Sequence, residues 1–280
     1  MTAVIDDPLI DGMSIGRLLP LHESSRRLRA LYPECPRVYG VAVMSDVSKR
    51  RWWPLADALS TERLKVMFDA SAAEMDSRTT AAQQMAATLA HAVLGRVVAL
   101  VVLEGRAWDT GLENLWVHVD SEGAIDWLGV RDATLRVLPG DPCTQGDVSA
   151  TGVEGVVQLP SEAALATWIA HRCHRTLAPL FERLYEVSGG AVSIASMWHT
   201  VGTAIVVAAT QVPLLAGSSE VVGMRRGQAV LDALVRFGLP VRGQAALQMA
   251  PLGRRTVQSR RYVPLNRREG LAKLGQPCLS

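Results

Sequence analysis

A change in hydrophobic period near residue 97 constrains the fold of this chain more than any other feature. Before it, Thr79–Leu94 (TTAAQQMAATLAHAVL) is rich in the Ala, Gln, Met and Leu residues that favour a helix. After it, Val97–Leu103 is a continuous apolar run, and Leu115–Val119, Ala124–Val130 and Ala133–Leu138 follow with turn residues between them. Extended runs at such short spacing predict an antiparallel β-meander.

From Ser161 onward the pattern becomes helical. The segment SEAALATWIAHRCHRTLAPLFERLYEVSG begins with a capping serine and is expected to be kinked or divided at Pro179. The further predicted helices are residues 193–211, ending before Pro213, and residues 227–237.

The order of these patterns predicts an α+β fold. Residues 1–150 are expected to hold the N-terminal helices and the antiparallel meander, with a short helix at Ser24–Tyr32 and a strand at Val38–Met44. Residues 151–280 are expected to form a mainly α-helical half that ends in a basic C-terminal tail. Pro139–Gly155, rich in Gly, Pro, Asp, Ser and Thr, is the expected linker.

Composition places the chain among soluble globular proteins, since 49% of its residues are hydrophobic and 20% are charged. Its longest apolar runs are shorter than the roughly 20 residues that a membrane-spanning helix needs. The first residues, MTAVIDDPLIDG, carry acidic side chains where a secretory signal has positive charge. We therefore expect a cytoplasmic protein without a membrane span.

Cys35, Cys143, Cys173 and Cys278 are too widely separated for a CxxC or CxxxC pair. In a reducing compartment this pattern predicts buried or free thiols. The chain has no GxGxxG after a strand, no Walker motif, no GxSxG and no HExxH. Their absence removes the commonest enzyme classes that have a strong local signature.

The motif HRCH places His171 and His174 on one face of a predicted helix, with Cys173 between them. Both imidazoles could reach one metal ion, or both could be polar residues of the helix surface. No third ligand is evident from the sequence, so no metal site is predicted. His91 and His118 are isolated and are expected to be structural.

The positive charge lies mostly at the C-terminal end. From Arg225 onward the chain has eleven Arg or Lys residues and two acidic residues, although its formal net charge is only +2. Such a segment favours an anionic partner, or it is a solvated basic tail. Nucleic acid is not expected, because Tyr262 is the only aromatic residue among these arginines and no nucleic-acid-binding motif accompanies them.

Two segments resemble the FhuF-like ferric-siderophore reductase family. LAPLFERLYEVSGGAVSIASMWHTVGTAI is similar to the helical signature of that family, a PL-containing helix, a short break and a helix with a central Trp. Upstream, AAQQMAATLAHAVLGRVVALVVLEGRAWDTGLENLWVHVDSEGAIDWLGV is similar to its helix-then-strands half. Family members end in an arginine-led loop whose four cysteines hold a [2Fe–2S] cluster, which reduces ferric siderophores.

The chain departs from the family in this loop. Arg254-Arg255-Thr256 resembles its arginine-led start, but Val257 and Gln258 stand where two adjacent cysteines are expected. Cys278 resembles a lone remnant of the last cysteine pair. Because such a cluster needs four ligands, usually thiolates, we predict no cofactor and no metal site.

The resemblance then implies a site for a ferric siderophore or a related anionic chelator. Its candidate ligand-binding residues are Trp198, His199, Arg225, Arg226, Arg254, Arg255, Arg260, Arg261 and Tyr262. Three functions stay open. The protein binds the chelator as an accessory to siderophore or natural-product metabolism. It is a repurposed biosynthetic enzyme, with His199 or Tyr262 in acid–base catalysis. Or it is a reductase with an unusual metal site, or with a cluster shared across a homodimer.

Overall fold

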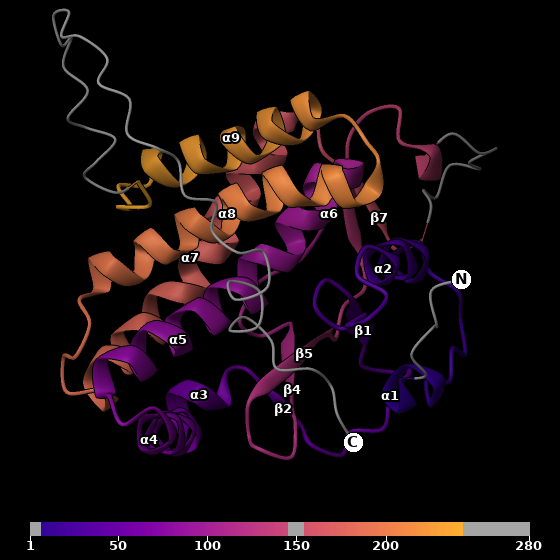
Figure 1. Ribbon diagram of the computed structural model, residues 1–280. Helices are drawn as coiled ribbons and strands as arrows, with labels where there is room; N and C mark the ends of the chain where they lie inside the picture. The colour runs from indigo at the N-terminus through magenta and orange to yellow at the C-terminus, as the bar shows by residue number, and fades with distance from the viewer. Residues whose placement is uncertain (1–6, 145–153, 243–280) are drawn as a thin grey trace, which may run out of the picture. The chain divides into compact units, whose positions relative to one another are not determined.

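A computed structural model describes residues 7–144 and 154–242 of the 280-residue chain. Met1–Arg242 form one compact unit, and residues 243–280 lie outside the described residues. Helices dominate the described chain, two small sheets lie between them, and its C-terminal part is helical (Figure 1). The predicted α+β class is therefore confirmed.

Short helices surround the first strands. They are α1 (Pro8–Asp11), α2 (Pro20–Ala30), α3 (Asp57–Ser60) and α4 (Arg63–Met75). Asp7 caps α1 by accepting a hydrogen bond from the backbone N–H of Leu9 (3.0 Å), and proline occupies the first turn of both α1 and α2. The helix predicted at Ser24–Tyr32 is thus found, but it begins four residues earlier at Pro20.

The larger sheet has the strand order β1-β5-β4-β2. Its strands are β1 (Val41–Val43), β2 (Trp52–Pro54), β4 (Leu115–Val119) and β5 (Ile125–Val130). β4 and β5 form the predicted antiparallel hairpin, in which Val117 lies opposite Leu128. β1 adds to β5 in parallel, so the sheet is mixed.

The second sheet corrects the predicted course of the meander. It contains β3 (Ala107–Trp108), β6 (Leu135–Val137) and β7 (Val156–Gln158). The run Ala133–Leu138 does not continue the β4–β5 hairpin, because β6 pairs antiparallel with β3 and parallel with β7. A 3₁₀ turn at Pro142–Thr144 follows β6.

The run Val97–Leu103 is helical. The prediction that grouped it with the extended runs was therefore wrong. It belongs to α6 (Arg96–Glu104), which continues α5 (Arg78–Ala90) through one π-helical turn at His91–Gly95. Nearly every side chain of α6 is buried, and a helix enclosed on all sides loses the polar face that reveals its period.

Three long helices complete the unit: α7 (Glu162–Val187), α8 (Ile194–Ala216) and α9 (Glu220–Arg236). Ser161, Ser193 and Ser219 cap them through their side chains. α7 is not divided at Pro179, and α8 continues through Pro213, where the sequence predicted it to end. α9 begins seven residues before the predicted start at Gly227.

Two glycines of α9 allow a close approach to α8. A Cβ atom on Gly227 would lie 2.5 Å from the Cβ of Ala209, and one on Gly223 would collide with the ring of Pro213. A side chain at either position would therefore push the two helices apart.

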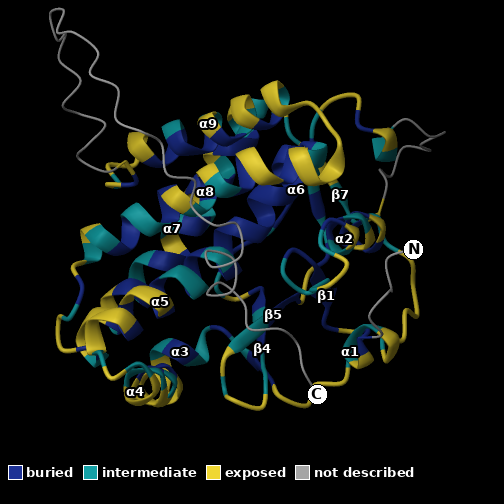
Figure 2. Cartoon of the chain, viewed as in Figure 1, coloured by how far each residue is buried: buried dark blue, intermediate teal, exposed yellow. Residues whose placement is uncertain are grey.

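The two predicted halves share one hydrophobic core. α6, from residues 1–150, packs against α8 and α9, from residues 151–280 (Figure 1). Leu100 of α6, Ile205 of α8 and Leu234 of α9 are fully buried members of that core. Figure 2 shows this interior as a dark band through the helices, with exposed residues along their outer sides.

Two helical segments among the described residues are long and apolar enough to cross a membrane, although the sequence predicted no span. They are Arg78–Glu104, which is mostly buried in the protein, and Ile194–Ala216, which is mostly not. One or two such helices are weak evidence for a span, since the core helix of a soluble protein has the same composition.

Candidate functional site

The predicted site residues fall into three groups. Trp198 and His199 lie in α8, and Arg225 and Arg226 lie in α9. The other members, which are Arg254, Arg255, Arg260, Arg261, Tyr262 and the lone Cys278, lie outside the described residues.

Trp198 is a packing anchor between α7 and α8. It is 3% exposed, and its ring meets Phe181 edge-on at a centroid distance of 5.3 Å. The ring of His174 lies on another side of it at 6.0 Å. Such aromatic contacts stabilise a core beyond the area they bury.

His171 and His174 converge on an aromatic residue that the sequence analysis missed. The ring of Phe237, at the end of α9, lies 6.1 Å from that of His171 and 6.2 Å from that of His174. We call His171, His174, Trp198 and Phe237 the imidazole–aromatic cluster. His171 and Phe237 are exposed and His174 is partly exposed, so the cluster reaches the surface where α7, α8 and α9 meet.

The cysteine of the HRCH motif does not belong to this cluster. Cys173 is fully buried, and its sulfur lies 3.2 Å from the hydroxyl of Thr110. Burial raises the pKa of its thiol to about 12, which keeps the sulfur protonated. Among residues 7–144 and 154–242, no three His, Cys, Asp or Glu side chains are grouped as a metal site requires.

The cysteines do not fit a [2Fe–2S] cluster. The chain has four, and Cys173 is enclosed beside Thr110, so fewer than the usual four thiolates remain. Burial also raises the pKa of the Cys143 thiol, against the opposing effect of Arg106. These cysteines therefore do not supply the ligands that electron transfer through such a cluster needs.

His199 is partly exposed and follows Trp198 in α8. One turn later, Gly202 allows another part of the chain to cross the helix, because a Cβ there would collide with the carbonyl oxygen of Val241. The last described residues therefore pass within one helical turn of Trp198, next to the imidazole–aromatic cluster. The next arginine in the sequence is Arg254, twelve residues after Arg242.

Arg225 and Arg226 lie away from that cluster and share one carboxylate. Glu162 Oε1 accepts from Arg225 Nη2 (2.8 Å) and from Arg226 Nε (3.2 Å). Arg226 also donates to the carbonyl oxygens of Val101 (3.3 Å) and Val102 (3.1 Å), near the end of α6. Arg226 thus ties α6, α7 and α9 together beside a crevice of about 10 Å³.

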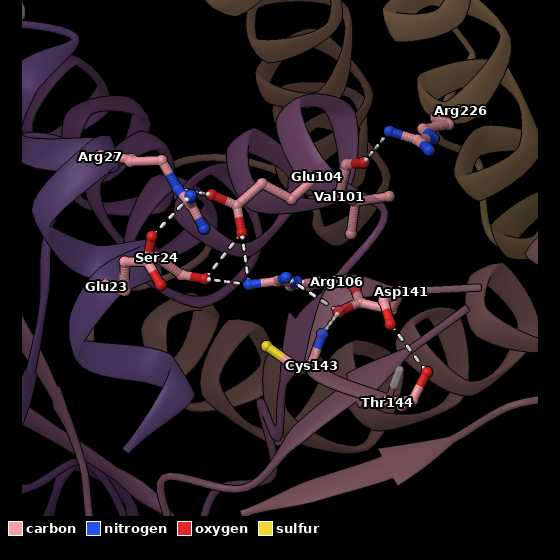
Figure 3. A network of polar contacts seen from close by, with 10 residues as sticks. All are labelled: Glu23, Ser24, Arg27, Val101, Glu104, Arg106, Asp141, Cys143, Thr144 and Arg226. Atoms are coloured by element: carbon pink, nitrogen blue, oxygen red, sulfur yellow. Dashed lines mark hydrogen bonds and ion pairs between the residues drawn. The ribbon is translucent and has the colours of Figure 1, made fainter. Parts of the chain in front are cut away.

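A buried ionic network joins α2, α6 and the turn after β6 (Figure 3). Arg106 makes a bidentate pair with Asp141, at 2.7 and 2.8 Å, and lies 3.1 Å from Glu104. Glu104 in turn accepts from Arg27 Nε (2.6 Å). Each charge has a partner of opposite sign, so we assign this network a structural role.

Two histidine–aspartate pairs also have structural explanations. His22 Nε2 lies 2.6 Å from Asp46, and its Nδ1 accepts from the backbone N–H of Leu19 (2.8 Å), so both ring nitrogens are in use. His118 Nδ1 lies 2.7 Å from Asp126, and its buried ring packs on Trp52 at 5.3 Å. An acid–base catalyst must reach a substrate. Neither His22 nor His118 lines the crevice beside Arg226 or the hollow at the end of α7.

A shallow, open hollow lies in the described surface at the end of α7. It has a volume of about 220 Å³ and is lined by Tyr185, Glu186, Gly189 and Gly190. Typical small-molecule pockets have roughly 300–1,000 Å³ and are more enclosed. This hollow is therefore smaller and more open than a typical small-molecule pocket.

Comparison of the chain with protein-family models, with curated proteins and with solved structures found no match.

Proposed function

We propose that the protein binds an anionic, metal-chelating small molecule of the ferric-siderophore class, as an accessory to siderophore or natural-product metabolism. The observation that carries the proposal is the imidazole–aromatic cluster. Two imidazoles and the exposed ring of Phe237 lie at the surface with the buried Trp198 behind them, and the last described residues pass beside this cluster.

The chemistry of the cluster suits such a ligand. Imidazole nitrogens donate to or accept from the oxygen atoms of hydroxamates and carboxylates. The exposed ring of Phe237 offers an apolar wall, and Trp198 holds His174 in place from the core side. Arginine forks, which the sequence supplies from Arg254 onward, match planar carboxylates.

The first experiment is a calorimetric titration of the full-length protein with ferric citrate and with a ferric trihydroxamate. The gallium forms of both chelates serve as redox-inert probes. The proposal expects the iron and gallium forms to bind equally well. It also expects Phe237→Ala and His174→Ala each to weaken binding about tenfold, which corresponds to about 1.4 kcal/mol.

Tyr185→Ala is the matched control, because Tyr185 is an exposed aromatic residue at the far end of α7. It is expected to leave the affinity unchanged. If neither chelate binds, or if the cluster variants bind as tightly as the wild type, the proposed site is wrong.

Two further measurements separate the competing functions. Iron and sulfide in stoichiometric amounts, with visible absorbance in anaerobically purified protein, would favour a reductase. Conversion of the bound compound during incubation, followed by mass spectrometry, would favour a biosynthetic enzyme. His199→Ala then tests the acid–base role of that residue, since it lies beside the cluster and is partly exposed.

A further inference from the structure

The outward face of α8 carries no charge. The sequence has no Asp, Glu, Lys or Arg between Glu186 and Glu220, a stretch that includes the whole of α8. From Thr203 to the end of this helix, the exposed residues are Thr203, Val206, Thr210, Gln211, Leu214, Leu215 and Ala216. A helix that faces water usually places charged side chains there.

The hydroxyl groups on α8 are already used within the helix. Thr200, Thr203 and Thr210 each donate to the carbonyl oxygen four residues earlier, at 3.3, 3.1 and 2.9 Å. An apolar surface placed over these threonines would therefore leave no hydroxyl donor without a partner. The threonine hydroxyls therefore do not oppose an apolar contact at this face.

The neighbouring helix extends this surface. α5 packs beside α8 (Figure 1), and the sequence has no Asp, Glu, Lys or Arg between Arg78 and Arg96. Its exposed residues within that stretch are Thr79, Thr80, Gln83 and Gln84. We call the exposed residues of α5 and α8 together the uncharged face.

The outline of α5 and α8 together is comparable in area to one side of a stable interface. α8 has 23 residues, so it is about 35 Å long. Two helices side by side are about 20 Å wide, which gives a footprint of about 700 Å². A standard protein–protein interface buries about 800 Å² on each partner.

We propose that the protein is a homodimer whose two copies meet through the uncharged face, with α8 of one copy packed on α8 of the other. A second copy brings the same row of Thr and Val side chains, so no like charges meet across the contact. A charged partner would find no group of opposite sign on this face.

Sedimentation equilibrium of the full-length protein tests this proposal. The wild type is expected to be a dimer at micromolar concentrations. Val206 lies midway along the exposed row and is 51% exposed, so Val206→Glu should fold normally yet place two like charges at the contact. We expect that variant to be a monomer.

The matched control is Val66→Glu on α4, where the valine is 65% exposed and lies outside the uncharged face. It is expected to remain a dimer. Mixing Val206→Glu with Val206→Lys should restore the dimer, because the two charges then attract each other. Circular dichroism and thermal melting confirm that each variant is folded, and Thr210→Lys replaces any that is not.

Three results would overturn the proposal. The wild type is a monomer at every concentration. The wild type is a monomer that sediments with vesicles of phosphatidylcholine and phosphatidylglycerol, in which case lipid covers the face. Or the folded Val206→Glu variant is still a dimer, in which case the two copies meet elsewhere.

Discussion

Two helical segments of this protein have similar composition but different surroundings. The most apolar 18-residue stretch of Arg78–Glu104 is 78% buried, whereas that of Ile194–Ala216 is only 39% buried. The fold itself encloses the first segment. The second segment packs on its inner side and presents its outer side uncovered. Apolar composition therefore indicates that a helix will be covered, but it does not say by what.

The largest expected effect is a cavity in the enclosed segment. Leu100 is fully buried in α6, so Leu100→Ala should lower the free energy of unfolding by about 3 kcal/mol. Leu214, at the end of α8, is 64% exposed in a single copy, so Leu214→Ala should cost the monomer less than about 0.5 kcal/mol when it is measured at protein concentrations too low for a dimer. Urea unfolding followed by circular dichroism measures both values.

Equal costs for these two leucines would contradict the comparison. A loss at Leu214 as large as that at Leu100 would mean that the end of α8 is covered in solution by something that stabilises the protein. Repeating the Leu214→Ala measurement at several protein concentrations shows whether that cover is a second copy.

A second effect concerns a charge-sensitive group inside the enclosed segment. His91, in the π-helical turn, donates from Nε2 to the carbonyl oxygen of Val38 at 2.8 Å. Burial, together with the nearby positive charge of Arg96, lowers the pKa of His91 from 6.5 to about 4. Because the folded state resists protonation, this part of the stability is complete above about pH 6.5 and is lost as the pH falls toward 4.

The loss is expected to reach about 3 kcal/mol, since each pKa unit corresponds to about 1.4 kcal/mol. His91→Gln removes the titrating group, so its unfolding free energy should fall less than that of the wild type between neutral pH and about pH 4.5. Urea titrations at the two pH values measure the difference. Parallel losses in the two proteins would show that His91 is not the group responsible.

The sequence predicted elements where local pattern decides the structure. The helix at Thr79–Leu94 was correct because Ala, Gln, Met and Leu favour helices in any context. Val97–Leu103 was wrong because a fully buried run has the same pattern in a strand and in a helix. Pro213 lies inside α8, so the expectation that the helix would end before it was wrong.

The candidate site shows the same limit. His171 and His174 lie on one side of α7 because helical spacing requires it, and that could be predicted. Phe237 could not be predicted as their partner, because it lies more than sixty residues away in the sequence. The pairing of Glu162 with Arg225 and Arg226 could not be predicted either, because these residues are also more than sixty positions apart in the sequence.

A smaller loss of stability is expected where α8 packs against α9. Gly227→Ala places a methyl group 2.5 Å from the Cβ of Ala209, so α8 and α9 must separate. Despite the higher helix propensity of alanine, we expect a net loss of about 1–2 kcal/mol in unfolding free energy. Gly16→Ala is the control, because nothing lies within 4 Å of the added methyl group. An unchanged melting temperature for Gly227→Ala would show that the helices can separate freely.

The smallest expected effect lies on the uncovered side. Thr210 is exposed, and its hydroxyl donates to the carbonyl oxygen of Val206 within α8. Thr210→Val should therefore change the unfolding free energy by less than about 0.5 kcal/mol and leave a homodimer intact. The same change at Thr176 in α7 should cost about 1–2 kcal/mol, because that hydroxyl is buried and donates to the Thr110 carbonyl at 2.8 Å. A loss at Thr210 equal to that at Thr176 would mean that its hydroxyl bonds to a group outside α8. The contact at the uncharged face would then be polar. The two helical segments would differ in the polarity of the groups that contact them as well as in how much of their surface is buried.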